Sequence, residues 1–356
     1  MKILITGVCG FVGSSIARSL LEHDSSLKIF GIDNLSRPGS ETNRASLASQ
    51  GVKFFHADIR SQSDFEPLPK VDWVIDAAAN PSVLAGIGGQ TSSRQVVEHN
   101  LLGTVNVLEY CRRHAAGVIL LSTSRVYSIA PLAALPVEVI DRAYSPRFAD
   151  VSIPGLSAKG ISETFSVTPP ASIYGTTKFA SENLALEYAG AFDLPVWINR
   201  CGVMAGAGQY GRPDQGIFAY WINAYRRRAP LSYIGFDGLG HQVRDCLHPR
   251  DLTEMLWKQI NDKANGAQRV QNLSGGVASA MSLAQLSDWC AARFGRHEVV
   301  PASAPRAYDI PWMVLDSTRA EEQWNWRAAT TTEQILSEIA EHAEKHPDWL
   351  EISAPS

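Results

Sequence analysis

The chain has 356 residues, of which 45% are hydrophobic, so it is long enough to bury a large core in one or two domains. Its formal net charge of −4 shows no basic surface for nucleic acid, and no run of 18 apolar residues would cross a membrane. The five cysteines are scattered and form no CxxC pair or Cys/His cluster, so the sequence predicts neither a disulfide framework nor a metal site.

The first expected element is a strand over residues 2–6, which leads directly into a glycine turn and then a helix. We therefore expect no signal peptide and a cytoplasmic location. A turn of this kind places free backbone N–H groups and a positive helix end at one point, where a dinucleotide pyrophosphate fits. It also occurs as a purely structural connection. The expected contacts to the cofactor are Gly7, Gly10, Phe11 and Val12, with Gly13 packing the helix on the sheet.

A second strand is expected over residues 27–32 and is followed directly by Asp33 and Asn34. Arg37 comes three residues later. Asp33 follows the glycines by about 20 residues, the distance at which an acid holds the adenosine ribose hydroxyls. Its carboxylate would repel a 2′-phosphate, which favours NAD over NADP. Arg37 keeps NADP open as an alternative.

Further strands are expected over residues 52–56, 71–76, 118–121 and 195–200, with a helix over 96–114. This alternation predicts an α/β protein with a Rossmann-type doubly wound parallel sheet and a smaller C-terminal α/β substrate lobe. We expect an NAD-binding domain over residues 1–200 with a long insert at about 128–172. Residues 201–356 would form mainly a nucleotide-sugar-binding lobe, interleaved with that domain.

A tyrosine and a lysine four residues apart, Tyr174 and Lys178, would share one helix face, and Thr123 follows the strand at 118–121. Lys178 and an oxidised nicotinamide would both lower the pKa of Tyr174. Tyr174 could then take the proton of a substrate alcohol while hydride leaves its carbon. The ordinary alternative is an exposed pair of surface residues.

These motifs together resemble the extended short-chain dehydrogenase/reductases of the nucleotide-sugar epimerase/dehydratase family. The similarity covers roughly residues 2–336 and includes the glycine spacing, Asp33, the Ser-Thr-x-x-Val-Tyr string at 122–127 and Tyr-x-x-x-Lys. Loops as long as the segment 128–172 are usually functional or disordered, so we expect it near the sugar site, with a disordered excursion as the alternative. The resemblance implies that 155–165 is the part that faces the sugar. Further contacts to NAD are implied at Asp58, Ile59, Ala77, Ala78, Ala79 and Asn100.

Substrate contacts are expected at Ser124, Arg125, Arg200, Arg212, Gln215, Arg244 and Arg306. Arg212 and Gln215 lie in a glycine-rich segment before a helix, where a diphosphate fits. Arg244 and Arg306 resemble the two diphosphate arginines of the family, since paired charge-assisted hydrogen bonds bind such a group best. The alternatives are a surface ion pair of Arg244 with Asp245 and an exposed loop position for Arg306.

Within the family, sugar-nucleotide 4,6-dehydratases carry an acid pair directly after the threonine, and the related decarboxylases carry a glutamate. Here these positions hold Ser124 and Arg125. The sequence therefore favours an NAD-dependent epimerase that oxidises and re-reduces one carbon, most like the CDP-tyvelose (CDP-paratose) 2-epimerase branch. A nucleotide-sugar 4-epimerase or reductase and a non-catalytic NAD-sensing protein are the alternatives. We expect a homodimer or homotetramer. The nucleotide base, the sugar and the reacting carbon stay open.

Overall fold

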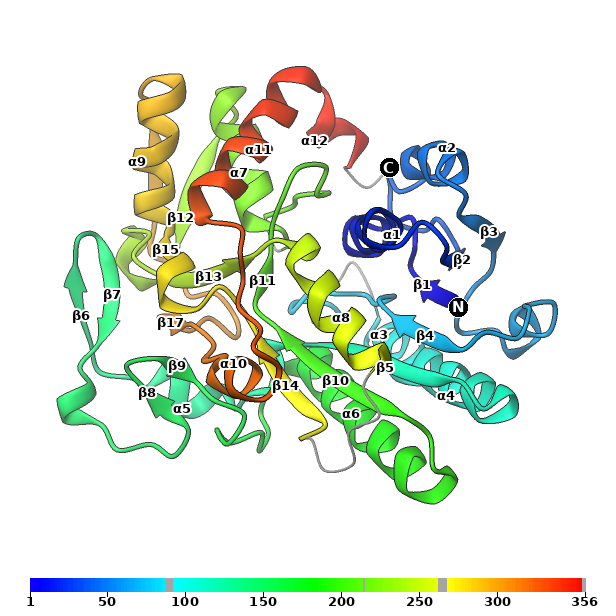
Figure 1. The fold of residues 1–356 in the computed structure, drawn as a ribbon. Helices are drawn as coiled ribbons and strands as arrows, with labels where there is room; N and C mark the ends of the chain where they lie inside the picture. The colour runs from blue at the N-terminus through cyan, green and yellow to red at the C-terminus, as the bar shows by residue number, and fades with distance from the viewer. Residues whose placement is uncertain (88–91, 214, 262–267, 354–356) are drawn as a thin grey trace.

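The computed structural model describes residues 1–87, 92–213, 215–261 and 268–353. Its centre is a seven-stranded sheet whose neighbouring strands are all parallel (Figure 1). The strand order reverses between β1 and β4, as in a doubly wound dinucleotide-binding sheet. The predicted fold class is confirmed. In order across the sheet the strands are β14 (Val270–Leu273), β10 (Val196–Cys201), β5 (Gly117–Thr123), β4 (Trp73–Asp76), β1 (Lys2–Thr6), β2 (Lys28–Asp33) and β3 (Lys53–His56).

Helices cover both faces of this sheet (Figure 1). Successive residues of a strand point to opposite faces, so Ile3 and Ile5 pack with α1 (Phe11–His23) and α8 (Leu252–Asn261), whereas Leu4 packs with α4 (Gly103–His114) and α6 (Ser172–Phe192). The helix expected over residues 96–114 is confirmed as α3 (Ser93–Val97), one π-helical turn over Glu98–Leu102 and α4. No helix in the described part of the chain is both long and apolar enough to span a bilayer.

The Thr6 side chain fixes the loop that follows β4 beside the glycine turn. The Thr6 hydroxyl donates to Asp76 Oδ1 at 2.6 Å and accepts the backbone N–H groups of Ala77 and Ala78, each at 3.0 Å. Gly7 has a φ of +64°, which favours glycine, and a Cβ on Gly13 would lie 2.2 Å from the Gly7 carbonyl oxygen. Two strand ends are thus held together at the reversal point, where ligands of such sheets bind.

A smaller α/β layer lies against the carboxyl ends of the central strands. Its β13 (Val243–Leu247) pairs with β11 (Val203–Met204), β15 (Ala280–Ser282) and β17 (Trp312–Met313). Between β13 and β15 the chain returns to the central sheet as β14, so lobe and sheet alternate along the sequence. The lobe also contains β12 (Leu231–Ile234), β16 (Val299–Ala302), α7 (Ile217–Arg226), α9 (Leu283–Phe294) and α11 (Thr332–Lys345). The remaining helices are α2 (Thr42–Ser49), α10 (Thr318–Trp324) and α12 (Trp349–Ile352).

The insert at 128–172 does not line the main cavity, which corrects the expectation that it lies at the sugar site. Its apolar side chains, such as Leu132 and Phe165, instead form a core cluster with Trp312 and Leu315 behind the lobe. The segment 155–165 is held there by backbone hydrogen bonds between Ile161 and Val314 and between Asp316 and Ile161. The ordered pieces of the insert are α5 (Ile129–Ala133), β6 (Val137–Ile140), β7 (Ala143–Pro146), β8 (Leu156–Ser157) and β9 (Gly160–Ile161).

Candidate active site

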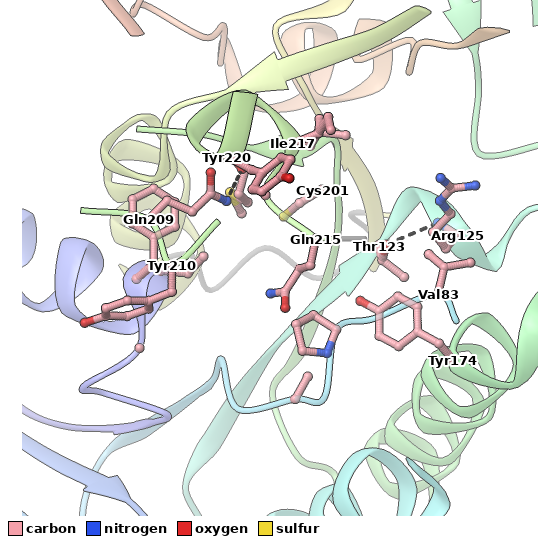
Figure 2. Close-up of a pocket in the computed structure, with 18 of the residues that line it drawn as sticks. Val83, Thr123, Arg125, Tyr174, Cys201, Gln209, Tyr210, Gln215, Ile217 and Tyr220 are labelled. Carbon is pink, nitrogen blue, oxygen red and sulfur yellow. Dashed lines mark hydrogen bonds between the residues drawn. The ribbon is translucent and has the colours of Figure 1, made fainter. Parts of the chain in front are cut away.

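A cavity of about 640 Å³ lies between the carboxyl ends of the central strands and the smaller lobe. Figure 2 shows Thr123, Arg125 and Tyr174 in one part of it, with Gln209, Tyr210 and Gln215 in another. Most of the residues expected from the sequence line this cavity. They are Gly7, Gly10, Phe11, Val12, Asp33, Asn34, Arg37, Ile59, Ala77, Ala78, Ala79, Thr123, Ser124, Arg125, Tyr174, Lys178, Gln215, Arg244 and Arg306.

The glycine turn offers backbone donors to an anion. Gly10 precedes α1, and no side chain caps this helix end. A Cβ on Gly10 would have only the Gly7 carbonyl oxygen nearby, at 3.1 Å, so the turn is open toward the cavity. The first N–H groups of a helix have no partner within it and carry its positive end, so a pyrophosphate fits here.

The Asp33 carboxylate is held at the glycine turn by backbone hydrogen bonds. Its oxygens accept the N–H groups of Cys9 at 3.0 Å and Leu35 at 2.8 Å. Burial raises the pKa of Asp33, and these hydrogen bonds oppose the rise. Carboxylate oxygens have further lone pairs, which suit ribose hydroxyl donors.

Arg37 lines the cavity but bonds across it to the loop that precedes α7. Its guanidinium donates to Gln215 Oε1 at 2.9 Å and to the Tyr210 carbonyl oxygen. These bonds join the adenosine side of the cavity to the lobe. Because that guanidinium is engaged and Asp33 is an acid, the site fits NAD better than NADP.

The three expected catalytic residues meet at the cavity. Thr123 ends β5, and its hydroxyl oxygen accepts the Arg125 backbone N–H at 3.2 Å. Tyr174 and Lys178 lie one turn apart on α6, and both are buried. The Tyr174 hydroxyl points toward Thr123 in Figure 2.

The pKa of Tyr174 differs from the expectation. Burial raises it, and the Thr123 hydrogen bond and the positive charge of Arg125 oppose the rise. Lys178 is not among these causes, and burial lowers the pKa of Lys178 itself. In the protein without its cofactor, desolvation of the phenolate therefore outweighs the nearby charges and raises the pKa of Tyr174.

Arg244 and Arg306 both reach the cavity from the lobe. Arg244 pairs with Asp309 at 3.1 Å rather than with Asp245, and it also donates to the carbonyl oxygens of Val243 and Ile310. Arg306 is partly exposed and has a 3.4 Å contact to the Pro213 carbonyl oxygen. Burial is the main cause that lowers the pKa of Arg244, and Asp309 opposes it.

Three expected contacts do not line the cavity but hold residues or segments near it. Asp58 pairs with Arg60 at 2.6 Å and accepts the Asn34 amide at 3.0 Å. Asn100, in the π-helical turn, exchanges hydrogen bonds with the Asn80 backbone at 2.7 and 3.1 Å. Arg212 donates to the Ser353 carbonyl oxygen at 3.4 Å.

Arg200 is not at the cavity, so its expected role in substrate binding is corrected. Its buried guanidinium pairs with Glu182 at 2.6 Å, contacts the Tyr127 hydroxyl at 3.3 Å and lies 5.1 Å from the Tyr127 ring centroid. Because a buried charge needs a partner, this arginine belongs to the packing between β10 and α6.

Other lining residues escaped the sequence analysis because they belong to no motif, and only the fold brings them to the cavity. Asp309 could have been suspected from the sequence, because it follows Arg306 by three residues. Its ion pair with Arg244, however, is formed only in the folded structure. The residues missed include Val83, Leu84, His99, Gln209, Tyr210, Phe218, Tyr220, Trp221, Gln242, Met281 and Leu283.

Comparison with known proteins agrees with this geometry. The model of the NAD dependent epimerase/dehydratase family matches residues 3–274. The chain belongs to this family. It is 30% identical over 310 residues to CDP-paratose 2-epimerase of Salmonella typhi, covering 82% of this chain and 85% of that protein.

It is also 26% identical to a probable dTDP-glucose 4,6-dehydratase of Sinorhizobium fredii, over 92% of this chain and 88% of that protein. Its fold is similar to that of UDP-glucuronic acid 4-epimerase from Bacillus cereus, solved with UDP-glucuronic acid and NAD. That similarity has a TM-score of 0.77 at 24% identity and covers 97% of this chain and 99% of the other. The protein is therefore an NAD-dependent enzyme of the nucleotide-sugar epimerase/dehydratase type.

The first prediction concerns the form of the cofactor. Because the Asp33 carboxylate would repel a 2′-phosphate, denaturing the purified protein should release NAD⁺ or NADH. Mass spectrometry of the supernatant measures this directly. Substituting Asp33→Asn should reduce the retained NAD, whereas Asp24→Asn, an exposed acid at the end of α1, should not. Release of NADP alone would contradict the prediction.

Proposed function

We propose that this enzyme is an epimerase of a nucleotide-diphosphate sugar, acting by transient oxidation to a keto-sugar and re-reduction on the other face, and that it is a CDP-sugar 2-epimerase. The observation that carries the epimerase proposal is the set Thr123, Tyr174 and Lys178 at the cavity without an acid pair beside it. The CDP-sugar assignment is supported by the relative from Salmonella typhi.

Each of the three residues has a distinct role in this proposal. Thr123 hydrogen-bonds the oxygen of the reacting carbon, and Tyr174 removes the proton of that hydroxyl and later returns it. Lys178, buried one helical turn from Tyr174, holds the nicotinamide ribose. When bound, NAD⁺ would supply the hydride acceptor and donor, and its positive ring would favour the tyrosinate form.

The charges around the cavity argue against water elimination. Among the described lining residues the carboxylates are Asp33, at the glycine turn, and Asp309, which is paired with Arg244. Neither stands beside Thr123, where the chain has Ser124 and Arg125. Elimination needs a proton donor for the leaving hydroxide and a base for the carbon acid, whereas epimerisation needs only the one acid–base group.

The decisive test is incubation with CDP-, UDP- and dTDP-hexoses in deuterated water. An epimerase of this mechanism should give a product of unchanged mass, because hydride returns to the same carbon without exchange with solvent. NMR of the product identifies the inverted carbon. Inversion at C4 would establish the alternative 4-epimerase, and a product lighter by one water would overturn the epimerase proposal.

Arg306 is expected to bind the substrate diphosphate. Arg306→Ala should weaken the binding of CDP by about 1.5–3 kcal/mol, the contribution of a charged hydrogen bond, and leave NAD retention unchanged. Calorimetry with CDP and UDP measures the effect and compares the two bases. Arg94→Ala is the matched control, because Arg94 is exposed, pairs with Glu98 and does not line the cavity. Unchanged affinity in the Arg306 variant would place the diphosphate elsewhere.

A closed assembly of two or four copies is also proposed. Light scattering at several protein concentrations tests it, and a mass equal to one chain throughout would contradict it.

A further inference from the structure

Arg125 presents an unsatisfied cation to the cavity. Its Nη1 nitrogen is shielded from solvent and has no hydrogen-bond partner among the residues that the structure describes. The other arginines described in the cavity have partners, since Arg244 is paired with Asp309, Arg37 is bonded to Gln215 and Arg306 contacts the Pro213 carbonyl oxygen. A buried donor of a charged group that lacks a partner is costly, so it marks a place where a ligand group completes the contact.

The position of Arg125 is fixed next to the reacting hydroxyls. Its backbone N–H donates to Thr123 Oγ1 at 3.2 Å, and its charge lowers the pKa of Tyr174. Figure 2 shows Arg125 directly beside Thr123. The backbone of Arg125 is therefore next to the hydroxyl that the proposed mechanism places at the reacting oxygen.

The surroundings of the guanidinium are positive. Burial and the charges of Arg244 and Arg306 lower the pKa of Arg125 to about 9, and Asp309 opposes the decrease. Arg125 is still a cation at neutral pH. Asp309 already pairs with Arg244, so no free carboxylate among the described lining residues balances Arg125.

We propose that Arg125 binds an anionic group carried by the sugar, so that the substrate is the nucleotide-diphosphate derivative of a sugar acid. This inference rests on the proposed function, since it assumes that a nucleotide-diphosphate sugar occupies the cavity. A carboxylate matches a guanidinium through two parallel N–H···O bonds, which neutral hydroxyls cannot supply with the same charge and geometry.

The competing destination for Arg125 is the diphosphate itself. Arg244 and Arg306 act electrostatically on Arg125, so all three could surround one anion. We favour the sugar because the backbone of Arg125 is bonded to the Thr123 hydroxyl, whereas Arg244 and Arg306 line the cavity from the lobe. The two destinations can be distinguished by the affinity for CDP, which has no sugar substituent. This affinity depends on Arg125 only if Arg125 binds the diphosphate.

The experiment compares three probes, CDP, CDP-glucose and CDP-glucuronic acid, by calorimetry on the NAD-loaded protein. The unmodified protein should bind CDP-glucuronic acid more tightly than CDP-glucose. In Arg125→Gln, CDP and CDP-glucose should bind as before, and CDP-glucuronic acid should bind about ten- to a hundredfold more weakly. Arg125→Lys keeps the charge and should retain part of the preference, whereas Arg306→Ala should weaken all three probes.

Each other outcome decides against the inference in a recognisable way. Equal affinity of the unmodified protein for CDP-glucose and CDP-glucuronic acid overturns it without any variant. Weaker binding of CDP itself in Arg125→Gln assigns the residue to the diphosphate. If none of the three probes binds to the unmodified, NAD-loaded protein, and the corresponding UDP series also fails, the proposed function has failed rather than the role of Arg125. Retained NAD and an unchanged melting temperature show that the variants are folded.

Discussion

Replacing Tyr174 with phenylalanine is expected to lower turnover by about two to four orders of magnitude, the usual contribution of a general acid–base group. The loss follows because Tyr174 is the group at the cavity that faces Thr123 and can exchange a proton with the substrate alcohol. Turnover is measured as the rate of epimer formation at saturating substrate. The affinity for CDP and the retained NAD should change little, because removing one hydroxyl leaves the diphosphate and pyrophosphate contacts in place.

The same substitution elsewhere on α6 provides the control. Tyr188 is also on this helix, and its hydroxyl donates to Glu109 at 2.5 Å outside the cavity. Tyr188→Phe should retain nearly normal turnover. If Tyr174→Phe and Tyr188→Phe behaved alike, Tyr174 would not be the acid–base group.

The second large effect is expected from Arg200→Met, as a loss of about 3–5 kcal/mol in the free energy of unfolding. Arg200 is 5% exposed and Glu182 is 1% exposed, so removing the guanidinium leaves a carboxylate buried without its counter-charge. Ser122 also donates to Glu182, but one hydroxyl cannot replace the charge. Denaturant unfolding measures the loss.

The double variant Arg200→Met with Glu182→Met is the informative control. It removes both charges and fills the space with apolar atoms, so it should be more stable than Arg200→Met alone. CDP affinity should be unchanged in every variant that folds, since Arg200 does not line the cavity. A stable Arg200→Met protein with weakened CDP binding would restore the substrate role that the sequence suggested.

The sequence alone determined those parts of the site whose chemistry depends on neighbours close along the chain. The glycine turn needs Gly7 at a positive φ and Gly13 against the Gly7 carbonyl, which the short spacing of these residues already indicates. Asp33 directly follows a predicted strand, and Tyr174 and Lys178 are one helical turn apart. The parallel sheet could also be predicted from the sequence, because each strand and helix is recognised by a hydrophobic pattern within a short segment.

The tertiary structure decided everything that depends on a distant partner. Nothing in the sequence distinguishes the roles of Arg200 and Arg306. In the structure, Arg200 pairs with Glu182 of α6 in the interior, whereas Arg306 lines the cavity. The insert at 128–172 packs behind the lobe because its apolar residues find Trp312 and Leu315. Asp309 pairs with Arg244, and the Arg125 Nη1 nitrogen has no partner among the described residues. A charged side chain acquires its role from the partner that folding brings to it, and no local pattern records that partner.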